Sequence, residues 1–522
     1  MNISKEFIFK ALKDIVGDEW VSDDVAILEG YSKSAAILPD SALRKHRKQQ
    51  HLPAWVVLPG CTAEVQALLR TANRYKIPIM PMGTGFIFSA PLVPDVMVID
   101  MKRMDKILEI NADDLTATVQ PNVSYAMLQA ETMRRGLWNG GCPLAGSQCK
   151  LGAQFNIAGY WQNMLVGGTL LRHTVSVTVV TPEGDIIKTG SPSLPGGGNI
   201  WWHGPGPDLT GLFRQSLGSF GIITEMVVKL KPWVGGAALP EDREEFDHPP
   251  LPPNHRIYWI EYPDLESEIK AVYEIGRAGI GTHLNGVDTA YNCYYSQATQ
   301  ERTEKLFKEK FFPDWLIYVV ITGISSKRQM DYEEKVLLEI IEETGGKLLS
   351  ENYKPKVLKE LEFWNLDAFR ASLVARMMRR GGFLTDDLRL SRLEFIPLQY
   401  KSHLEAMERH PEHPHITDMG TTFVYGVDRG HIGVNETDMY YNQADPKEIE
   451  AALNIGMEEL VATGTSGLGT FWAISEPLMT LIGPVVGPNL HQITAEIRKV
   501  FDPNDILASG GKLVDIKEGV GE

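Results

Sequence analysis

The stretch that decides the fold is Gly204–Trp233, which reads GPGPDLTGLFRQSLGSFGIITEMVVKLKPW. It predicts a Gly/Pro turn, a helix over Leu209–Ser216, a tight loop over Ser216–Gly221 and an apolar strand over Ile222–Leu230. The small residues of the loop let a flat or phosphate-bearing ligand approach the main chain, whose N–H groups stay free to bond it. The sequence therefore predicts a ligand-binding turn that leads into a buried strand.

A second glycine-rich loop lies far upstream, in a region of short α/β units. Trp55–Pro59 is an apolar strand, and a helix opens at Thr62 with apolar residues at helical spacing. Ile77–Met80 then leads into the loop Met82–Gly85, which reads MGTG. The chain thus carries two separate loops at which a ligand can reach the backbone.

The segment between the two loops is unusual in its composition. Residues 136–170 are rich in Gly, Asn, Gln and Trp, and no carboxylate occurs between Glu131 and Glu183. Its aromatic and aliphatic residues favour a backbone that lines a bound ligand, and a Gly-rich surface loop stays the alternative. Residues 175–181 and 185–189 then predict a β-hairpin.

Together these segments resemble the flavin-binding domain that p-cresol methylhydroxylase and vanillyl-alcohol oxidase share. The match extends to a Pro-containing entry at Val57–Val65, a strand ending in Asp-Met at Val98–Met101 and a closing motif at Phe501–Leu507. A lone GTG loop is weak evidence, but its spacing to the Ser216–Gly221 loop makes it specific. The resemblance implies an α+β fold with an FAD-binding domain of two α/β subdomains and a ferredoxin-like α+β cap.

The family also implies how the cofactor is held. Its first glycine loop binds the FAD pyrophosphate through backbone N–H groups, and Met82 stands where many members carry an Arg that makes a charge-assisted contact. The FAD-binding residues that the resemblance implies are Met82, Gly83, Thr84, Gly85, Phe86, Pro121, Gly140, Gly141, Gly146, Ser147, Asn156, Ser216, Gly218, Ser219, Gly221, Ile222, Ile223 and His431.

Size and composition set the broad class of the protein. A chain of 522 residues exceeds one compact core, and its net charge of −16 argues against a nucleic-acid binder. The N-terminus reads as an amphipathic helix with Phe7, Leu12 and Ile15 on one side, and it lacks the features of a signal peptide. No apolar run approaches the ~20 residues that span a bilayer. We expect a cytoplasmic protein with no membrane span and no nucleic-acid partner.

The Pro/Glu/Asp-rich segment at residues 239–255 marks the best domain boundary. We expect the FAD-binding domain at residues 1–238, the substrate cap at 239–464, and a C-terminal segment at 465–522 that returns to the FAD-binding domain. Beyond the boundary the pattern changes to one that resembles split β-α-β units. It predicts helices at Leu265–Ala278 and Lys327–Thr344.

His431, in the segment Gly426–Ile432, is the first catalytic candidate. It matches, with a one-residue gap, the cap strand where vanillyl-alcohol oxidase places the histidine that links the flavin 8α-methyl group. A hydrogen-bonding histidine near a turn is the alternative. Residues 430–435, GHIGVN, also resemble the segment of flavin 2-hydroxy-acid dehydrogenases whose histidines hold a metal. Because Thr437 or Asp438 stands where the second histidine is needed, we predict no metal site.

The sequence departs from the phenol-oxidising members at two places. These members stabilise the phenolate with a Tyr-Arg pair that aligns here with Leu468 and Gly469. They also place an Asp near the flavin as a base, which aligns here with Ser147. Since a phenolate needs positive charge or hydrogen-bond donors, another group must act or the substrate is not a phenol.

The candidates for the missing oxygen-binding group are Arg379, Arg380, Arg389 and Arg392, because arginine pairs readily with phenolate or carboxylate oxygens. Arg392 is the first of them, because it lies just before a strand predicted at Glu394–Leu398, whereas a solvated charged face is the alternative for the others. Tyr425 and Trp472 are candidates for an aromatic substrate pocket, with core packing as the alternative. The predicted catalytic residues are therefore His431, Arg392, Trp472 and Tyr425, with His431 as tether or base.

The predicted reaction is hydride transfer from a substrate C–H bond to the flavin N5 of FAD, with a para-alkylphenol or aromatic alcohol as substrate. A 2-hydroxy acid is the alternative substrate, and a non-catalytic flavin electron-transfer subunit is the alternative of another class. Electrons would pass to oxygen or to a cytochrome-like or iron–sulfur protein. The cap predicts a homo-oligomer, with a dimer as the first expectation.

Overall fold

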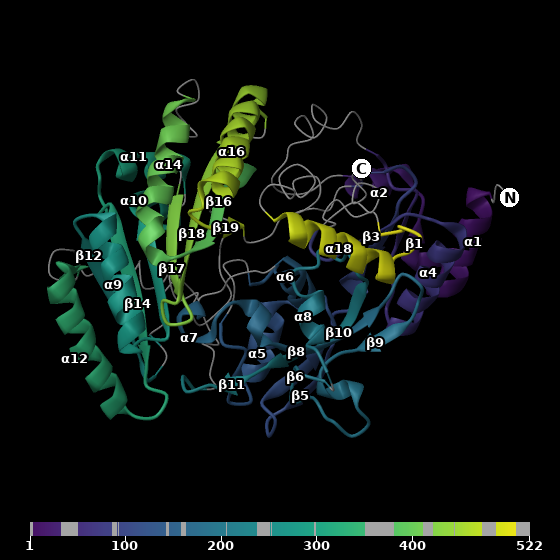
Figure 1. Ribbon diagram of the computed structural model, residues 1–522, viewed down its shortest axis with the longest axis horizontal. Coiled ribbons are helices and arrows are strands. Elements are labelled where there is room, and N and C mark those ends of the chain that lie inside the picture. The colour runs from purple at the N-terminus through teal and green to yellow at the C-terminus, as the bar shows by residue number, and fades with distance from the viewer. Residues whose placement is uncertain are drawn as a thin grey trace.

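The computed structural model describes residues 4–32, 51–85, 91, 93–141, 146–157, 163–204, 206–236, 251, 253–296, 299–349, 381–410, 421–442, 444–471 and 487–507. Figure 1 shows two bodies side by side. The N-terminal half, up to residue 236, runs from purple to blue, and the cap, from residue 253 to 471, runs from teal to green. The C-terminal helix α18 (Pro488–Phe501) lies over the N-terminal half.

The first sheet of the N-terminal half has the strand order β1-β2-β4-β3, in which β2, β4 and β3 run parallel. Its elements are α1 (Lys5–Val16), β1 (Val21–Ser22), α2 (Val25–Gly30), β2 (Trp55–Val57), α4 (Thr62–Tyr75), β3 (Ile79–Met82) and β4 (Met97–Asp100). Helices α1 and α4 cover one face of this sheet and share a core with it. The parallel strands bring the ends of β3 and β4 to one edge of the sheet, where open α/β sheets bind ligands.

Helix α1 confirms the predicted amphipathic N-terminus but buries a different stripe. Ile8, Leu12 and Val16 are buried, whereas Phe7 is 52% exposed. The prediction that Phe7 lies on the buried side is wrong, because residues four apart share a helix face and Phe7 is five residues from Leu12.

The second sheet has the order β5-β6-β10-β8-β9, and a short pair, β11-β7, lies beside it. The elements of this part are β5 (Ile107–Asn111), β6 (Thr116–Val119), α5 (Tyr125–Met133), β7 (Leu137–Trp138), α6 (Leu151–Ile157), α7 (Met164–Gly167), β8 (Thr174–Val180), β9 (Ile186–Lys188), α8 (Leu209–Phe213), β10 (Ile222–Lys229) and β11 (Lys231–Pro232). Strand β10 is central, and its apolar run packs on both faces because six of its eight residues are buried.

The C-terminal segment packs on the N-terminal half. The Phe501 ring lies 5.8 Å from the Phe213 ring and 5.7 Å from the Phe220 ring, centre to centre. The backbone N–H of Ile79 donates to the carbonyl of Ile506 at 2.7 Å, so residues 506–507 extend the edge of β3. The closing motif therefore contacts the strand that leads into the first glycine loop.

The cap is an antiparallel eight-stranded sheet in the order β15-β12-β14-β13-β17-β18-β16-β19. Its elements are β12 (His255–Tyr262), α9 (Leu265–Ala278), β13 (His283–Asp288), α10 (Thr289–Ser296), α11 (Gln300–Lys308), β14 (Trp315–Thr322), α12 (Lys327–Thr344), β15 (Lys347–Leu348), β16 (Gly381–Ser391), α14 (Ile396–Glu408), β17 (Thr421–Val427), β18 (Ile432–Asn442), α16 (Pro446–Ser466) and β19 (Thr470–Phe471). The helices predicted at Leu265–Ala278 and Lys327–Thr344 are confirmed as α9 and α12.

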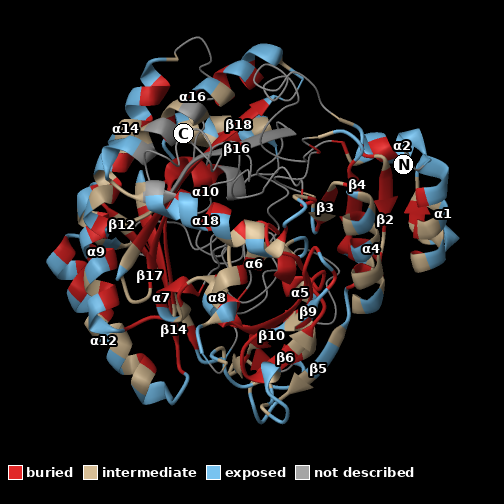
Figure 2. Cartoon of the chain, turned by 45° about the vertical axis from the view of Figure 1, so that its right-hand side comes forward, coloured by how far each residue is buried: buried red, intermediate tan, exposed pale blue. Residues whose placement is uncertain are grey.

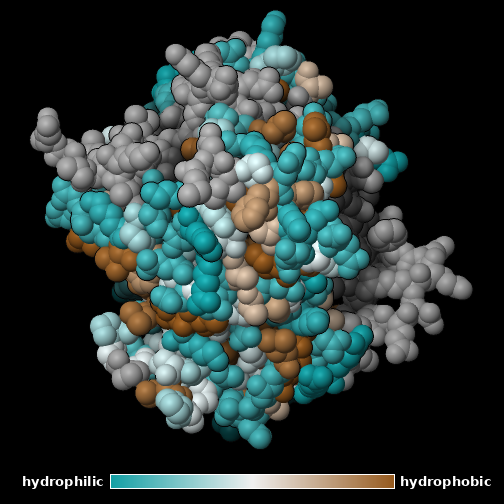
Figure 3. Space-filling view, turned by 90° about the vertical axis from the view of Figure 1, so that its right-hand side faces the viewer, coloured by the Kyte–Doolittle hydropathy of each residue, from teal (hydrophilic) through white to brown (hydrophobic). Residues whose placement is uncertain are grey.

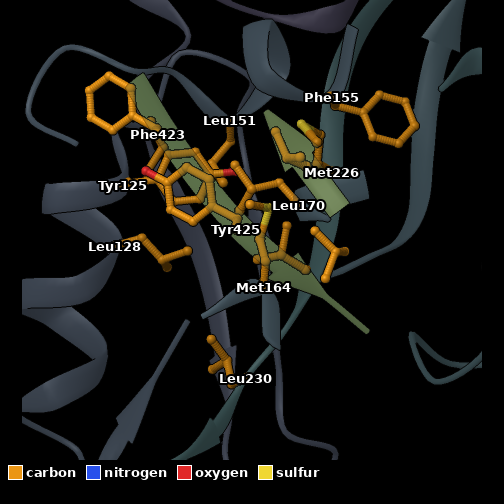
Figure 4. Packing of buried hydrophobic residues seen from close by; sticks show 14 of the residues in the cluster. Tyr125, Leu128, Leu151, Phe155, Met164, Leu170, Met226, Leu230, Phe423 and Tyr425 are labelled. Atoms are coloured by element: carbon orange, nitrogen blue, oxygen red, sulfur yellow. The ribbon is translucent and has the colours of Figure 1, made fainter. Parts of the chain in front are cut away.

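The two faces of the cap sheet have different partners. On β17, Phe423 and Tyr425 share a core with Tyr125, Leu151 and other residues of the N-terminal half. Val424, between them, packs with α9 and α12 instead. Figure 4 shows Phe423 and Tyr425 among the apolar residues of the N-terminal half. We call the face that carries Phe423 and Tyr425 the inner face, and the helix-covered face the outer face.

The strand predicted at Glu394–Leu398 is wrong. Residues 393–395 form a short 3-10 helix that runs into α14, and Pro397 occupies the first turn of α14, where its missing N–H is not needed. Of the apolar residues that suggested a strand, Ile396 is buried in the core, whereas Leu398 is 51% exposed.

Burial follows this arrangement across the molecule. In Figure 2 the central strands of both bodies are buried, whereas the covering helices expose their outer sides. The side of the molecule in Figure 3 mixes hydrophilic side chains with small hydrophobic areas. In the described part of the chain, every helix is too short or too polar to traverse a bilayer.

Candidate cofactor and substrate site

The two glycine loops meet around helix α6. A Cβ placed on Gly83 would lie 3.2 Å from the Cβ of Ala153 in α6, and one on Gly218 would lie 3.1 Å from the Cγ of Pro81. Gly218 also has a positive φ of 73°, which disfavours a side chain independently of space. Glycine at these positions lets three chain segments approach each other closely.

Asn156 joins α6 to the downstream loop. Its Oδ1 accepts from Ser216 Oγ and from the backbone N–H of Gly218, both at 3.1 Å, and its Nδ2 donates to the carbonyl of Gly152 at 2.9 Å. The N–H of Leu217 donates to the Asn156 carbonyl at 3.3 Å. The structure thus brings Asn156, Ser216 and Gly218, which are distant in sequence, into one hydrogen-bonded unit.

The loop after β3 presents free backbone donors. Gly83 and Thr84 are exposed, and among the described residues no acceptor bonds the backbone N–H of either one. Consecutive N–H groups at the end of a parallel strand form an anion-binding concavity. Met82 is buried and packs under the sheet with Met80 and Val98, so its side chain supplies no charge to this loop.

A charged group lies at the neighbouring strand end. Asp100, the last residue of β4, is in register with Met82 and is 2% exposed. Tyr31 Oη donates to Asp100 Oδ2 at 2.5 Å, and Lys102 Nζ lies 2.8 Å from the same oxygen. Burial, together with the hydrogen bond to Asp100, raises the pKa of Tyr31, so its phenol stays protonated and donates. Lys102 thus offsets the negative charge of Asp100 at this edge of the sheet.

The middle loop supplies further backbone close to these segments. Gly140 and Gly141 are buried and have φ of 93° and 130°, values that favour glycine. A Cβ on Gly152 would lie 2.6 Å from Pro121 Cβ, which places Pro121 against α6. Asn139 is 5% exposed, and no described residue bonds its Oδ1 or its Nδ2. Buried amides are normally satisfied, so this one is suited to bind a ligand or water.

The remaining predicted cofactor residues occupy varied positions. Gly146 and Ser219 are buried, and Ser147 is exposed. Gly221 has φ of 148° and lies against the carbonyl of Val180, while Ile222 and Ile223 point into two hydrophobic cores. Gly85, with φ of 68°, follows the exposed pair Gly83 and Thr84. Phe86 lies outside the described residues.

The predicted catalytic residues do not gather at one place. Tyr425 is 1% exposed on the inner face of the cap. His431 is exposed, in the turn between β17 and β18, where its N–H donates to the Asp428 carbonyl. The Arg392 side chain is 69% exposed and pairs with Glu394, so its position gives no support to a role in binding the substrate oxygen. Trp472 lies outside the described residues.

His431 is also far from the residue aligned with a second metal ligand. It directly precedes β18, and Asp438 lies seven residues along that strand. At about 3.3 Å per residue the two Cα atoms are about 23 Å apart, too far to share a metal ion. Among the described residues, no group of three or more His, Cys, Asp or Glu side chains is arranged to hold a metal.

The structure instead places two carboxylates on the inner face that sequence reasoning missed. In β18, Val434 and Tyr440 belong to the core shared with the N-terminal half, so the alternating residues Glu436 and Asp438 face the same way. Glu436 pairs directly with Phe423, and Asp438 pairs with Thr421. Glu436 is 4% exposed and Asp438 2%. The sequence signal was acids at alternating positions in an otherwise buried strand.

Comparisons with known proteins agree with this geometry. Residues 53–190 match the FAD binding domain. Glycolate oxidase subunit GlcD of Bacillus subtilis is 32% identical over 185 residues, which cover 35% of this chain and 38% of that protein. The 4-cresol dehydrogenase [hydroxylating] flavoprotein subunit of Pseudomonas putida is 23% identical over 500 residues, or 89% of each chain. A probable mitochondrial D-lactate dehydrogenase of Danio rerio is 26% identical over 98% of this chain and 93% of its own length.

The solved structure of p-cresol methylhydroxylase with substrate bound has the same fold, with a TM-score of 0.78 at 18% identity, and covers 99% of this chain and 98% of its own. The matching domain and the site define an FAD-dependent oxidoreductase. The chain therefore carries an FAD-binding domain, and its fold is that of p-cresol methylhydroxylase. The expected cofactor and α+β fold class are therefore confirmed.

Proposed function

We propose that the protein oxidises a para-alkylphenol or an aromatic alcohol at a C–H bond next to the ring. The observation that supports this most is the inner face of the cap, where Phe423, Tyr425 and Tyr440 stand beside the buried carboxylates Glu436 and Asp438. Aromatic side chains suit a ring-shaped substrate, and a carboxylate accepts a proton from a hydroxyl group.

The backbone of the N-terminal half fits FAD. The free N–H groups of Gly83 and Thr84 would hold the pyrophosphate, and the loop fixed by Asn156 would support the cofactor from the other side. Bound FAD supplies a hydride acceptor, and its reduced form passes electrons to oxygen or to a redox protein. The Met82 side chain contributes packing alone, so backbone N–H groups carry the proposed phosphate contacts of this loop.

In this proposal Glu436 accepts the hydroxyl proton of the substrate while the C–H bond is oxidised. Tyr425 and Phe423 hold the aromatic ring against the N-terminal half and exclude water. His431 remains our candidate for a covalent tether, which acid precipitation of the yellow protein would test. Arg392 would bind the substrate oxygen only if its ion pair with Glu394 opened.

The alternative substrate is a 2-hydroxy acid, and the similarity to the glycolate oxidase subunit and to the D-lactate dehydrogenase favours it. A carboxylate substrate needs a cation to offset its charge. Among the described residues of the inner face, the buried titratable side chains that a carboxylate substrate would meet include two acids, Glu436 and Asp438, and one histidine, His283. Burial lowers the pKa of His283 to about 3, so this histidine is neutral at physiological pH.

The test is anaerobic reduction of the FAD-loaded protein by 4-alkylphenols, followed as bleaching of the flavin absorbance. We predict that Glu436→Gln slows this reduction by roughly 10²–10⁴-fold, the range for loss of a general base. Glu268→Gln is the matched control, because Glu268 is equally buried but lies against Gly286 on the outer face. Equal rates in the two variants would remove Glu436 from the mechanism.

A further inference from the structure

Four buried side chains on the inner face form a cluster that the proposed reaction does not use. Trp259, Tyr318 and Asn285 pair across three adjacent strands, and His283 lies two residues before Asn285 on the same side of β13. The Tyr318 ring lies 4.9 Å from the Trp259 ring and 5.0 Å from the His283 ring. Asn285 Nδ2 lies 3.5 Å from Tyr318 Oη. We call these four residues the Asn285 cluster.

Several polar atoms of the Asn285 cluster have no hydrogen-bond partner in the described part of the chain. They are Trp259 Nε1, both ring nitrogens of His283, and Asn285 Oδ1. Their residues are between 0% and 4% exposed, so bulk water does not satisfy them. Native proteins rarely leave so many buried polar atoms unsatisfied together, because each one loses its hydrogen bonds to water without a replacement. Such a group of atoms indicates a bound partner, either internal water or a ligand.

The unpartnered atoms define what that partner must offer. The indole N–H only donates, the amide oxygen only accepts, and a neutral imidazole supplies one donor and one acceptor. A hydroxyl group both donates and accepts, so it complements this set. An ammonium or a carboxylate would lie buried without an opposite charge among these four residues, which is costly.

The Asn285 cluster lies within reach of the same substrate as Glu436. Val287, Phe423 and Glu436 occupy one row across β13, β17 and β18. Asn285 is two residues from Val287, about 6.6 Å along the strand, and Glu436 is two strands away, about 9.6 Å across. The two Cα atoms are therefore about 12 Å apart on one face. With both side chains extending inward, this span matches an aromatic ring that carries a polar group at each end.

We propose that the Asn285 cluster binds a second, uncharged hydroxyl group of the substrate, at the end remote from Glu436. This proposal rests on the proposed function and narrows it to aromatic compounds with two hydroxyl groups, one on the ring and one on the opposite substituent. The site selects between substrates and does not take part in the chemical step.

The experiment compares two probes, a 4-alkylphenol and the same phenol with a hydroxyl at the far end of its alkyl chain. Dissociation constants come from the perturbation of the bound flavin spectrum, and reduction rates from anaerobic bleaching. We expect the wild-type protein to bind the hydroxylated probe at least tenfold more tightly. Asn285→Leu should abolish this preference and leave the 4-alkylphenol affinity within about threefold, since one hydrogen-bonded hydroxyl accounts for about 1.4 kcal/mol.

The matched control is Asn435→Leu. Asn435 is also 0% exposed with an unpartnered amide, but it pairs with Val424 on the outer face of the same sheet. The Asn435→Leu variant should keep the preference for the hydroxylated probe. If Asn285→Leu does not fold, His283→Phe takes its place, and it too should abolish the preference for the hydroxylated probe. A wild-type protein without the preference, or an Asn285→Leu variant that keeps it, would overturn the proposal and leave the Asn285 cluster as a site of internal water. Failure of both probes to reduce the flavin would instead contradict the proposed function.

Discussion

His283 shows at the scale of one residue how burial sets chemistry. Burial holds its pKa at about 3, against 6.5 in the unfolded chain, so the folded protein keeps it neutral. Below pH 6.5 the unfolded state binds a proton that the folded state does not, and stability therefore falls as the pH drops from 6.5 towards 3. Where only the unfolded state carries the proton, His283 lowers the unfolding free energy by about 1.4 kcal/mol for each unit that the pH drops.

We predict that His283→Phe flattens the dependence of stability on pH in this window. The measurement is the denaturant unfolding free energy of both proteins between pH 7 and pH 4. The difference between the two curves isolates His283 from other buried histidines such as His173, whose pKa burial also lowers. Parallel curves would mean that His283 is protonated or solvated in the folded state.

A second single-residue prediction concerns Gly286 in β13. A Cβ on this residue would collide with the Glu268 carboxyl and lie 3.1 Å from Val424 Cβ, on the outer face. Glu268 is 1% exposed with both oxygens unpartnered, and burial, with Asp288 nearby, raises its pKa well above the usual value. We predict that Gly286→Ala destabilises the protein by about 1–3 kcal/mol, the usual cost of overpacking.

The double variant Gly286→Ala with Glu268→Ala supplies the check on that reason. Removing the carboxyl makes room for the new methyl group, so the Gly286→Ala substitution should cost less in the Glu268→Ala background than in the wild type. Thermal or denaturant unfolding of the four proteins measures this coupling. Additive effects would show that the collision is not the cause.

At the scale of elements, the cofactor site depends on how α6 is tied to the loop before β10. Asn156 makes that connection through Ser216 and Gly218. We predict that Asn156→Leu weakens FAD binding by about 10–100-fold, because two hydrogen bonds that fix the loop are lost. Gln154→Leu is the control on the same helix, since Gln154 contacts Cys149 rather than the loop. Quenching of FAD fluorescence on titration with each folded apoprotein measures the FAD affinity of both variants. Equal affinities in the two variants would refute the role of Asn156.

The elements also show what the sequence could predict. Regular helices such as α12 were predicted with correct ends, because their caps and apolar spacing are local signals: Ser326 caps the start and Gly345 the end. The strand predicted at Glu394–Leu398 failed, because a short apolar run fits a strand or a helix equally well and Pro397 decided for the helix. The close contacts at Gly83 and Gly218 could be located from the sequence, because glycine marks positions where backbone segments approach each other.

The substrate side was harder to predict for a physical reason. Glu436 and Asp438 acquire their importance from the register of β18 against β17, which places them opposite residues far away in the sequence. The Asn285 cluster likewise depends on three strands meeting side by side. Sequence alone pointed to His431 through a local motif, whereas tertiary pairing decides which polar residues face the N-terminal half.

At the scale of the whole molecule, the cap and the N-terminal half share one hydrophobic core, with Tyr125 and Phe155 on one side and Phe423 and Tyr425 on the other (Figure 4). A ligand that binds only the folded state stabilises that state by mass action, and we expect FAD to do so here. We predict that FAD at 100 times its dissociation constant raises the unfolding free energy by about 2.7 kcal/mol. Unfolding of apoprotein with and without FAD measures this, and an unchanged transition would contradict the assigned cofactor site.

The most direct test of the central claim is anaerobic reduction of the FAD-loaded protein by three donors, namely a 4-alkylphenol, glycolate and D-lactate. Our account predicts that the phenol bleaches the flavin and that the two 2-hydroxy acids leave it oxidised. Bleaching by glycolate or D-lactate but not by the phenol would contradict the assigned substrate class and the role given to the inner face of the cap.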